Sequence, residues 1–202
     1  MSVINLYHED CMPALKEMKD NQYDLAIVDP PYGIGMDGGQ LGYSKHPQKG
    51  WDKQIPPEEY FKQLNRVSKN QIIWGFNHFL NRLEPTKAVI FWNKHQNGYF
   101  AEGELAWCST GTVKYVDRPY QRDIGNKIHP TQKPIYLYEW LLMNYAKEGN
   151  KILDTHGGSM SIAIACHNLG FDLDLYEIDK EYFDAGKKRL EQHKSQLQLW
   201  QP

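Results

Sequence analysis

A chain of 202 residues is long enough to bury a hydrophobic core without a disulfide or a metal to hold it together. Hydrophobic residues make up 41% and charged residues 24%, and the net charge of −2 excludes a polybasic, histone-like protein. Any contact with nucleic acid must therefore come from a local basic patch. The three cysteines form no Cys-x-x-Cys pair, and no apolar run approaches the roughly 20 residues that span a bilayer.

Strand-like and helix-like segments alternate in the first half of the chain. Asp10 is expected to cap a helix over residues 12–18, and residues 24–28 form an apolar run typical of a buried strand. That strand ends at Asp29, because the two prolines after it cannot continue a central ladder. Residues 33–50 are rich in glycine and predict a long loop. The other expected elements are strands over residues 4–7, 71–75 and 88–92 and a helix over residues 56–68.

The last third of the chain alternates more clearly. Its pattern predicts helices over residues 134–146, 161–169 and 181–193 and strands over residues 151–154 and 172–176. Residues 95–128 are polar, aromatic and weakly periodic, and they predict no definite element. Residues 1–202 are therefore expected to form one α/β domain, in which residues 95–128 are a candidate small insertion.

A strand, a glycine turn, a helix and a second strand predict a small-molecule site near the C-terminus. In an open α/β sheet, ligands bind outside the carboxyl ends of the strands, where Asp154 and Glu177 lie. An acid at the second of these ends can accept hydrogen bonds from ribose hydroxyls, and Gly157-Gly158 lets the backbone approach a ligand. A purely structural turn explains this pattern equally well. No G-x-G-x-x-G or P-loop pattern is present, which disfavours a pyrophosphate cofactor.

The tetrapeptide Asp29-Pro30-Pro31-Tyr32 suits work on an exocyclic amine. Asp29 can accept a hydrogen bond from an NH₂ group, and the Pro30 carbonyl, which has no regular partner, can accept a second. Two prolines stiffen the turn, and Tyr32 offers a ring face on which a flipped base can stack. The alternative is a strand-ending turn with a surface tyrosine.

Together these motifs resemble those of S-adenosylmethionine-dependent DNA amino-methyltransferases. Asp29-Pro30-Pro31-Tyr32 resembles their catalytic motif, His129–Pro134 their H-P-T-x-K-P motif, and Asp154–Ser159 their cofactor loop. The catalytic motif precedes the cofactor loop, which is the permuted order of the β class. The short chain and the local sequence of its motifs are most similar to those of phage-encoded adenine-N6 enzymes. The resemblance implies a Rossmann-like methyltransferase fold with a mostly parallel sheet, helices on both faces and circularly permuted motifs.

The resemblance also implies roles for individual residues. Asp29 and the Pro30 carbonyl would bind the adenine N6 amine, with Pro31 stiffening the turn and Tyr32 stacking on the flipped base. Preorganised acceptors would draw the amine nitrogen towards tetrahedral geometry for in-line attack on the sulfonium methyl, without a covalent enzyme intermediate. The residues expected to hold S-adenosylmethionine are Asp10, Asp29, Thr131, Lys133, Asp154, His156, Gly158, Ser159 and Glu177.

The cofactor loop departs from the family pattern at two positions. The family loop usually ends in glycine where this chain has Met160, so either the backbone there keeps a negative φ or the cofactor sits slightly differently. His156 replaces an aromatic residue that often packs on the cofactor. It is expected either to stack in the same way or to be an ordinary core histidine.

Double-stranded DNA is the expected partner. Lys45, Lys49 and Lys53 are candidate phosphate contacts, with Trp51 as a stacking residue in the same loop. A second basic cluster lies in residues 95–128, the candidate target-recognition segment, and consists of Lys114, Arg118, Arg122 and Lys127. No histidine spacing predicts a metal. A homodimer is left open, and the class implies a cytoplasmic protein of a bacterium or a phage-infected cell.

Several other functions remain open from the sequence. Cytosine-N4 methylation uses the same amine geometry, although Asp at position 29 leans towards adenine in the family. RNA or protein-glutamine methylation, an inactive DNA-binding module and a metabolic α/β enzyme are further alternatives. A carbon-5 cytosine methyltransferase is disfavoured, because it needs a nucleophilic cysteine, typically after a proline, and none of the three cysteines follows one.

Overall fold

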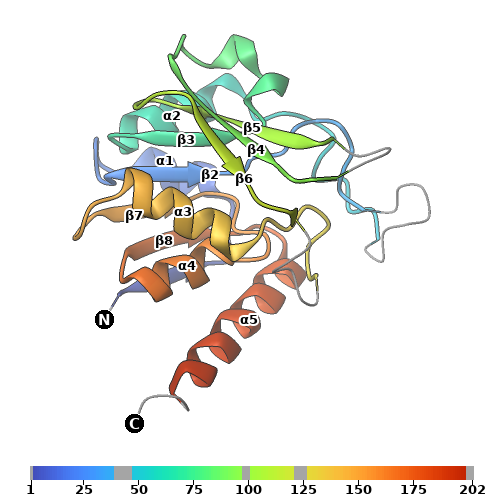
Figure 1. The fold of residues 1–202 in the computed structure, drawn as a ribbon, viewed down its shortest axis with the longest axis vertical. Helices are drawn as coiled ribbons and strands as arrows, with labels where there is room; N and C mark the ends of the chain where they lie inside the picture. Colours follow the sequence, from blue (N-terminus) through green and yellow to red (C-terminus); the bar gives the residue numbers. More distant parts are fainter. Residues whose placement is uncertain (1, 39–46, 97–100, 121–126, 199–202) are drawn as a thin grey trace.

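The computed structural model describes residues 2–38, 47–96, 101–120 and 127–198. Eight strands form a single sheet in the order β1-β8-β7-β2-β3-β5-β4-β6 (Figure 1). The strands are β1 (Ile4–Tyr7), β2 (Leu25–Val28), β3 (Gln71–Trp74), β4 (Ala88–Asn93), β5 (Gly103–Cys108), β6 (Lys114–Asp117), β7 (Lys151–Asp154) and β8 (Asp172–Tyr176). The α-helices are α1 (Cys11–Glu17), α2 (Glu58–Val67), α3 (Ile135–Tyr145), α4 (Ser161–Leu169) and α5 (Lys180–Gln198), and two 3-10 turns are η2 (Phe76–His78) and η3 (Leu80–Arg82).

Strands β1, β8, β7, β2 and β3 are parallel, whereas β5 runs antiparallel to both β3 and β4. The chain leaves β7 towards β8 through α4 and leaves β2 towards β3, in the opposite direction, through α2. Right-handed crossovers in opposite directions place their helices on opposite faces of the sheet. The carboxyl ends of β7 and β2 are therefore the point where the strand order reverses, and this is where open α/β sheets bind ligands.

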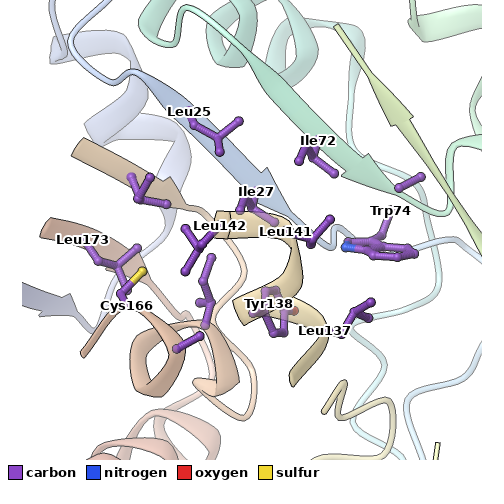
Figure 2. Packing of buried hydrophobic residues seen from close by; sticks show 14 of the residues in the cluster. Leu25, Ile27, Ile72, Trp74, Leu137, Tyr138, Leu141, Leu142, Cys166 and Leu173 are labelled. Carbon is purple, nitrogen blue, oxygen red and sulfur yellow. The ribbon is translucent and has the colours of Figure 1, made fainter. Parts of the chain in front are cut away.

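The hydrophobic core has two layers, one on each face of the sheet. On β2, Leu25 and Ile27 belong to the layer that contains α3 and α4, and Ala26 and Val28 belong to the layer that contains α1 and α2. Figure 2 shows the first layer, in which Leu141 and its neighbours on α3 lie against the strands. All four residues of β2 are buried, which explains why the sequence shows a continuous apolar run there rather than alternation.

The expected α/β Rossmann-like fold with a mostly parallel sheet and helices on both faces is confirmed. Asp10 caps α1 as expected, because its Oδ1 accepts a hydrogen bond from the Met12 N–H at 2.9 Å. The largest difference concerns residues 95–128. This stretch supplies β5 and β6, and β5 lies between β3 and β4 inside the sheet. The stretch is thus continuous with the main domain, and a target-recognition role for it stays a prediction.

In the part of the chain that the structure describes, no helix has the length and apolarity needed to cross a bilayer.

Helix α3 supplies a test of which residues hold the fold. Leu141 is fully buried against the sheet, whereas Met143 on the same helix is 64% exposed. Leu141→Ala is expected to lower the free energy of unfolding by about 2–5 kcal/mol, because it leaves a cavity in the core. Met143→Ala, the matched control, should stay within about 0.5 kcal/mol of wild type in the same urea titration. Equal losses in the two variants would contradict the packing described here.

Candidate active site

The Asp29-Pro30-Pro31-Tyr32 turn lies at the carboxyl end of β2, beside the end of β7. The Tyr32 hydroxyl donates a hydrogen bond to Asp29 Oδ1 at 2.5 Å, and Lys133 Nζ donates to Asp29 Oδ2 at 2.5 Å. Both carboxylate oxygens are thus held from within the protein. Each oxygen keeps a second lone pair, so Asp29 can still accept a hydrogen bond from a bound molecule.

Asp52 holds the backbone of this turn from the opposite side. It is buried, and its carboxylate accepts three backbone N–H groups: those of Tyr32 at 2.6 Å, Gly33 at 2.8 Å and Met36 at 2.7 Å. Hydrogen bonds to a charged carboxylate are stronger than neutral ones, so Asp52 fixes the position of Tyr32. The sequence gives no local signal for this role, because the contact joins two parts of a long loop.

Tyr32 lies against two groups that follow β3. Its ring stacks on His78, with centroids 5.0 Å apart and planes 11° apart. On Gly75, which has φ +70°, a Cβ would lie 2.0 Å from Tyr32 Cε1. Only glycine therefore allows the ring to lie where it does.

A cavity of about 410 Å³ opens in front of this turn. Asp29, Tyr32 and His78 line it together with Lys94 and Glu104 from the β4–β5 hairpin. Its volume falls within the range of roughly 300–1,000 Å³ that is usual for sites that bind small molecules.

Lys133 is buried and carries its charge between two carboxylates. Its Nζ lies 2.5 Å from Asp29 Oδ2 and 2.9 Å from Glu104 Oε2, and Lys94 Nζ lies 2.9 Å from Glu104 Oε1. Burial alone would lower the pKa of Lys133, but the two carboxylates outweigh it and raise that pKa, so the ammonium stays charged.

The two carboxylates beside Lys133, those of Glu104 and Asp29, differ in the direction in which their pKa is shifted. Burial would raise the pKa of Glu104, but Lys133 and Lys94 outweigh it and hold that pKa at about 2. Burial raises the pKa of Asp29 above its ordinary value, and Lys133 offsets this only in part. A charged Asp29 therefore depends on its neighbours more than an exposed carboxylate does.

A second, smaller cavity of about 90 Å³ lies over the glycine turn after β7. Glu177 at the end of β8 lines it, and its Oε2 accepts the Gly158 N–H at 2.7 Å while its Oε1 accepts the Asp179 N–H at 2.8 Å. Of the residues expected to hold a cofactor, those that line this cavity are Asp29, Thr131, Lys133, His156, Gly158, Ser159 and Glu177. Asp10 and Asp154 are absent from its lining.

Asp154 and His156 are both affected by burial. Burial raises the pKa of the Asp154 carboxyl to about 8, although the His156 N–H donates to Asp154 Oδ1 at 3.0 Å. Burial lowers the pKa of His156 to about 4, so its imidazole is neutral at neutral pH. The ring packs edge-on against Tyr60 with centroids 5.4 Å apart. It also faces the smaller cavity, so a stacking role on a cofactor stays a prediction.

Met160 adopts a backbone conformation that ordinarily favours glycine. Its φ is +56°, in the left-handed region, so the first of the two alternatives given above, a negative φ, is wrong. The side chain is fully buried, and a Cβ on Gly186 of α5 would lie 2.6 Å from Met160 Cγ. Gly186 thus makes room for the methionine, which adds buried contact that offsets the unfavourable backbone.

Residues 47–53 form a strap across the smaller cavity. Lys49 Nζ is paired with Asp179 at 2.8 Å and with Glu181 at 2.7 Å, and it lies 4.2 Å from the centre of the Tyr182 ring. The Trp51 ring lies 5.2 Å from that of His129. Of these two residues expected to contact DNA, Lys49 is therefore paired with acidic side chains and Trp51 lines the cavity.

The other predicted contacts are scattered over the surface. Lys53 and Arg118 are exposed, and Lys114 Nζ lies 3.4 Å from Asn144 Oδ1. Lys45 and Arg122 lie outside the described residues. In the described ranges, no group of three or more His, Cys, Asp or Glu residues could hold a metal ion.

Five residues at the site carry no signal in the sequence: Asp52, His78, Lys94, Glu104 and Arg189. Arg189 on α5 donates to the Ser159 carbonyl at 2.8 Å and to Ser161 Oγ at 2.9 Å, and thus fixes the end of the glycine turn to the start of α4. Each of the five acts through a contact between distant parts of the chain, so neither periodicity nor a motif could reveal it.

Comparison with known families identifies the chain. The DNA methylase family matches residues 71–188, more than half of the sequence. The chain belongs to this DNA methylase family. Among curated relatives, the Type II methyltransferase M.HpaI of Haemophilus parainfluenzae is 24% identical, and the match covers 90% of this chain and 72% of M.HpaI. The DNA adenine methyltransferase YhdJ of Escherichia coli K12 is 22% identical over 92% of this chain and 82% of its own length.

Solved methyltransferase structures share the fold. The complex of M1.HpyAVI with SAM has a TM-score of 0.64 and 18% identity, covering 93% of this chain and 99% of that one. The cytosine-N4-specific PvuII DNA methyltransferase has a TM-score of 0.67 and 12% identity, covering 96% and 91%. Proteins with this fold thus include an enzyme that acts on cytosine, so the fold does not identify the base.

The contact between Met160 and Gly186 predicts a strong coupling in this DNA methylase. Gly186→Ala should lower the free energy of unfolding by about 1–3 kcal/mol, because the new methyl group meets Met160. In a Met160→Gly background the same change should be neutral or stabilising, because alanine favours helix over glycine by about 1 kcal/mol. A double-mutant cycle by urea denaturation measures this coupling, and additive losses would refute the contact.

Proposed function

We propose that this DNA methylase is a site-specific adenine-N6 methyltransferase that uses S-adenosylmethionine. The observation that carries the proposal is the place of Asp29, which lines both cavities at the point where the strand order reverses. An amine acceptor shared by two adjoining cavities is what a transfer between a cofactor and a base requires. The adenine methyltransferase among the relatives supports the choice of base.

In this proposal the larger cavity receives the flipped base. Asp29 and the Pro30 carbonyl accept the two hydrogens of the amine, and the hydrogen bonds from Tyr32 and Lys133 fix the carboxylate that does so. Two acceptors in a fixed arrangement orient the nitrogen lone pair and draw the nitrogen towards tetrahedral geometry. The Tyr32 ring, held by Asp52, supplies a stacking face.

The smaller cavity suits the cofactor in chemistry. Glu177 can accept the ribose hydroxyls with its free lone pairs, and Gly157 and Gly158 bring backbone close to the ligand. The bound cofactor would supply the electrophilic methyl group. A volume of about 90 Å³ is below that of ordinary ligand sites, so the strap of residues 47–53 would have to move outwards to admit it.

Two alternatives are judged against the same residues. Met160 is the feature that favours an inactive module, but its backbone lies in the left-handed region that glycine adopts readily, so the methionine does not exclude a glycine-like loop. Cytosine-N4 methylation uses the same acceptors, and the cytosine-specific enzyme with this fold keeps it as an outcome of the test below. A homodimer and a cytoplasmic location stay predictions from the resemblance.

Methyl transfer gives the direct test of the function. Purified protein, S-adenosylmethionine and unmethylated plasmid DNA should yield N6-methyladenine, detected by nucleoside mass spectrometry. Asp29→Ala should lower the rate at least about 100-fold, because it removes a preorganised acceptor. N4-methylcytosine would keep the mechanism and change the base. No methylated base on duplex or single-stranded DNA would refute the proposal.

A DNA-binding experiment distinguishes the roles of Lys49 and Lys53, the two lysines of the strap. Lys49 is already neutralised by Asp179 and Glu181, whereas the Lys53 side chain is exposed. Lys53→Gln should therefore reduce the slope of log affinity against log salt by about 1, the contribution of one phosphate contact. Lys49→Gln, which makes the same chemical change, should leave the slope of the cofactor-free protein unchanged. Fluorescence anisotropy over a salt series measures both, and a larger effect of Lys49→Gln would contradict this assignment.

A further inference from the structure

Two charged residues of the β4–β5 hairpin line the larger cavity without a role in the function proposed above. Lys94 follows β4, where its backbone N–H continues the ladder by donating to the Glu102 carbonyl at 2.8 Å. Glu104 lies on β5, and its carboxylate is paired with Lys94 at 2.9 Å. Lys94 is buried, and a buried charge is costly unless it is paired.

Lys133 connects this pair to Asp29 in the Asp29-Pro30-Pro31-Tyr32 turn. Glu104 Oε2 lies 2.9 Å from Lys133 Nζ, which lies 2.5 Å from Asp29 Oδ2. The four residues therefore form a row of alternating charge, Lys94–Glu104–Lys133–Asp29, with two positive and two negative groups. Since the row is formally neutral, neutralising one member leaves a net charge close to the others.

We propose that Glu104 and Lys94 are positioning residues for the methyl transfer, which act through Lys133 to aim the Asp29 carboxylate at the substrate amine and to balance its charge, Lys94 favouring the charged form and Glu104 opposing it. The inference rests on the proposed function, because it assigns Asp29 the role of acceptor. Neither residue needs to touch the substrate. Their effect on Asp29 is carried by the Lys133 ammonium, which the two carboxylates share.

The row predicts opposite effects of its two hairpin residues, Glu104 and Lys94, on the pKa of Asp29. Glu104→Gln leaves Lys133 to Asp29 alone and gives the row a net positive charge, which lowers the pKa of Asp29. Lys94→Met gives the row a net negative charge, which raises the pKa of Asp29. Both variants leave unchanged the other titratable groups that interact with the row: Tyr32, Tyr60, Tyr120, Lys127, Tyr138 and Asp154.

The coupling is measured first without DNA. Protein labelled with ¹³C at the aspartate carboxyl is titrated by NMR, and the Asp29 signal is identified by its loss in Asp29→Asn. Glu104→Gln should lower the Asp29 pKa by about one unit and Lys94→Met should raise it by about one unit, a tenfold change in each proton affinity. Glu102→Gln is the matched control, because Glu102 is exposed on the same hairpin and should leave the value unchanged.

The rate of methyl transfer against pH then links the coupling to catalysis. Activity that needs ionised Asp29 falls as the pH drops through its pKa, so this acidic limb should move down in Glu104→Gln and up in Lys94→Met. Lys94→Arg keeps the charge and should restore the wild-type limb. If Lys94→Met does not fold, Lys94→Gln makes the same change of charge.

Each outcome decides one statement. An unchanged Asp29 pKa in both variants, or a shift in the same direction in both, overturns the inference. Opposite pKa shifts without a matching shift of the acidic limb overturn the role in catalysis. A wild-type protein that methylates no DNA refutes the proposed function, whereas the NMR titration still decides whether Glu104 and Lys94 act on Asp29.

Discussion

The handedness of β-α-β crossovers is the constraint on which the site depends. From β7 the chain moves one way across the sheet and from β2 it moves the other way, so α4 and α2 must cover opposite faces. No helix then closes the gap between the carboxyl ends of these two strands. Asp29, which follows β2, and Asp154, the last residue of β7, stand on either side of that gap, and both cavities open beside it. The order in which the motifs occur along the chain is free to change, because the gap depends on the direction of each crossover alone.

Burial of charge is the second condition that shapes the site. Lys133 is buried and would be costly alone, but it lies between Asp29 and Glu104. The same burial raises the pKa of Asp154 to about 8 and lowers that of His156 to about 4. A region that combines apolar surroundings with paired charges gives each hydrogen bond more strength than it would have in water. It also makes the ionisation of each group depend on the state of the others.

The sequence predicts the part of the fold that local patterns determine. The strands over residues 4–7, 151–154 and 172–176 and the helix over residues 161–169 have the expected bounds, because each is a short periodic or apolar segment beside clear turn signals. Strand β5 has no such signal. It carries Glu104, a charge that an alternation argument assigns to the surface and that the structure pairs with two lysines. The sequence gives no indication of the roles of Asp52 and Arg189 either, because their contacts join segments that are distant in the chain. Motif similarity, in contrast, located Asp29, Lys133 and Glu177, which the structure brings to one edge of the sheet.

The methionine in the cofactor loop has a consequence for how this chain could have evolved. A methionine at position 160 needs an α5 residue without a side chain at position 186, since any Cβ there would meet it. A lone glycine within a helix lowers its stability by about 1 kcal/mol, which an ancestor with a smaller residue in the loop could tolerate. Glycine at position 186 therefore had to be present before the methionine or to arise together with it. Once both were present, each made the loss of the other unfavourable, so the departure from the family motif became difficult to reverse by single steps.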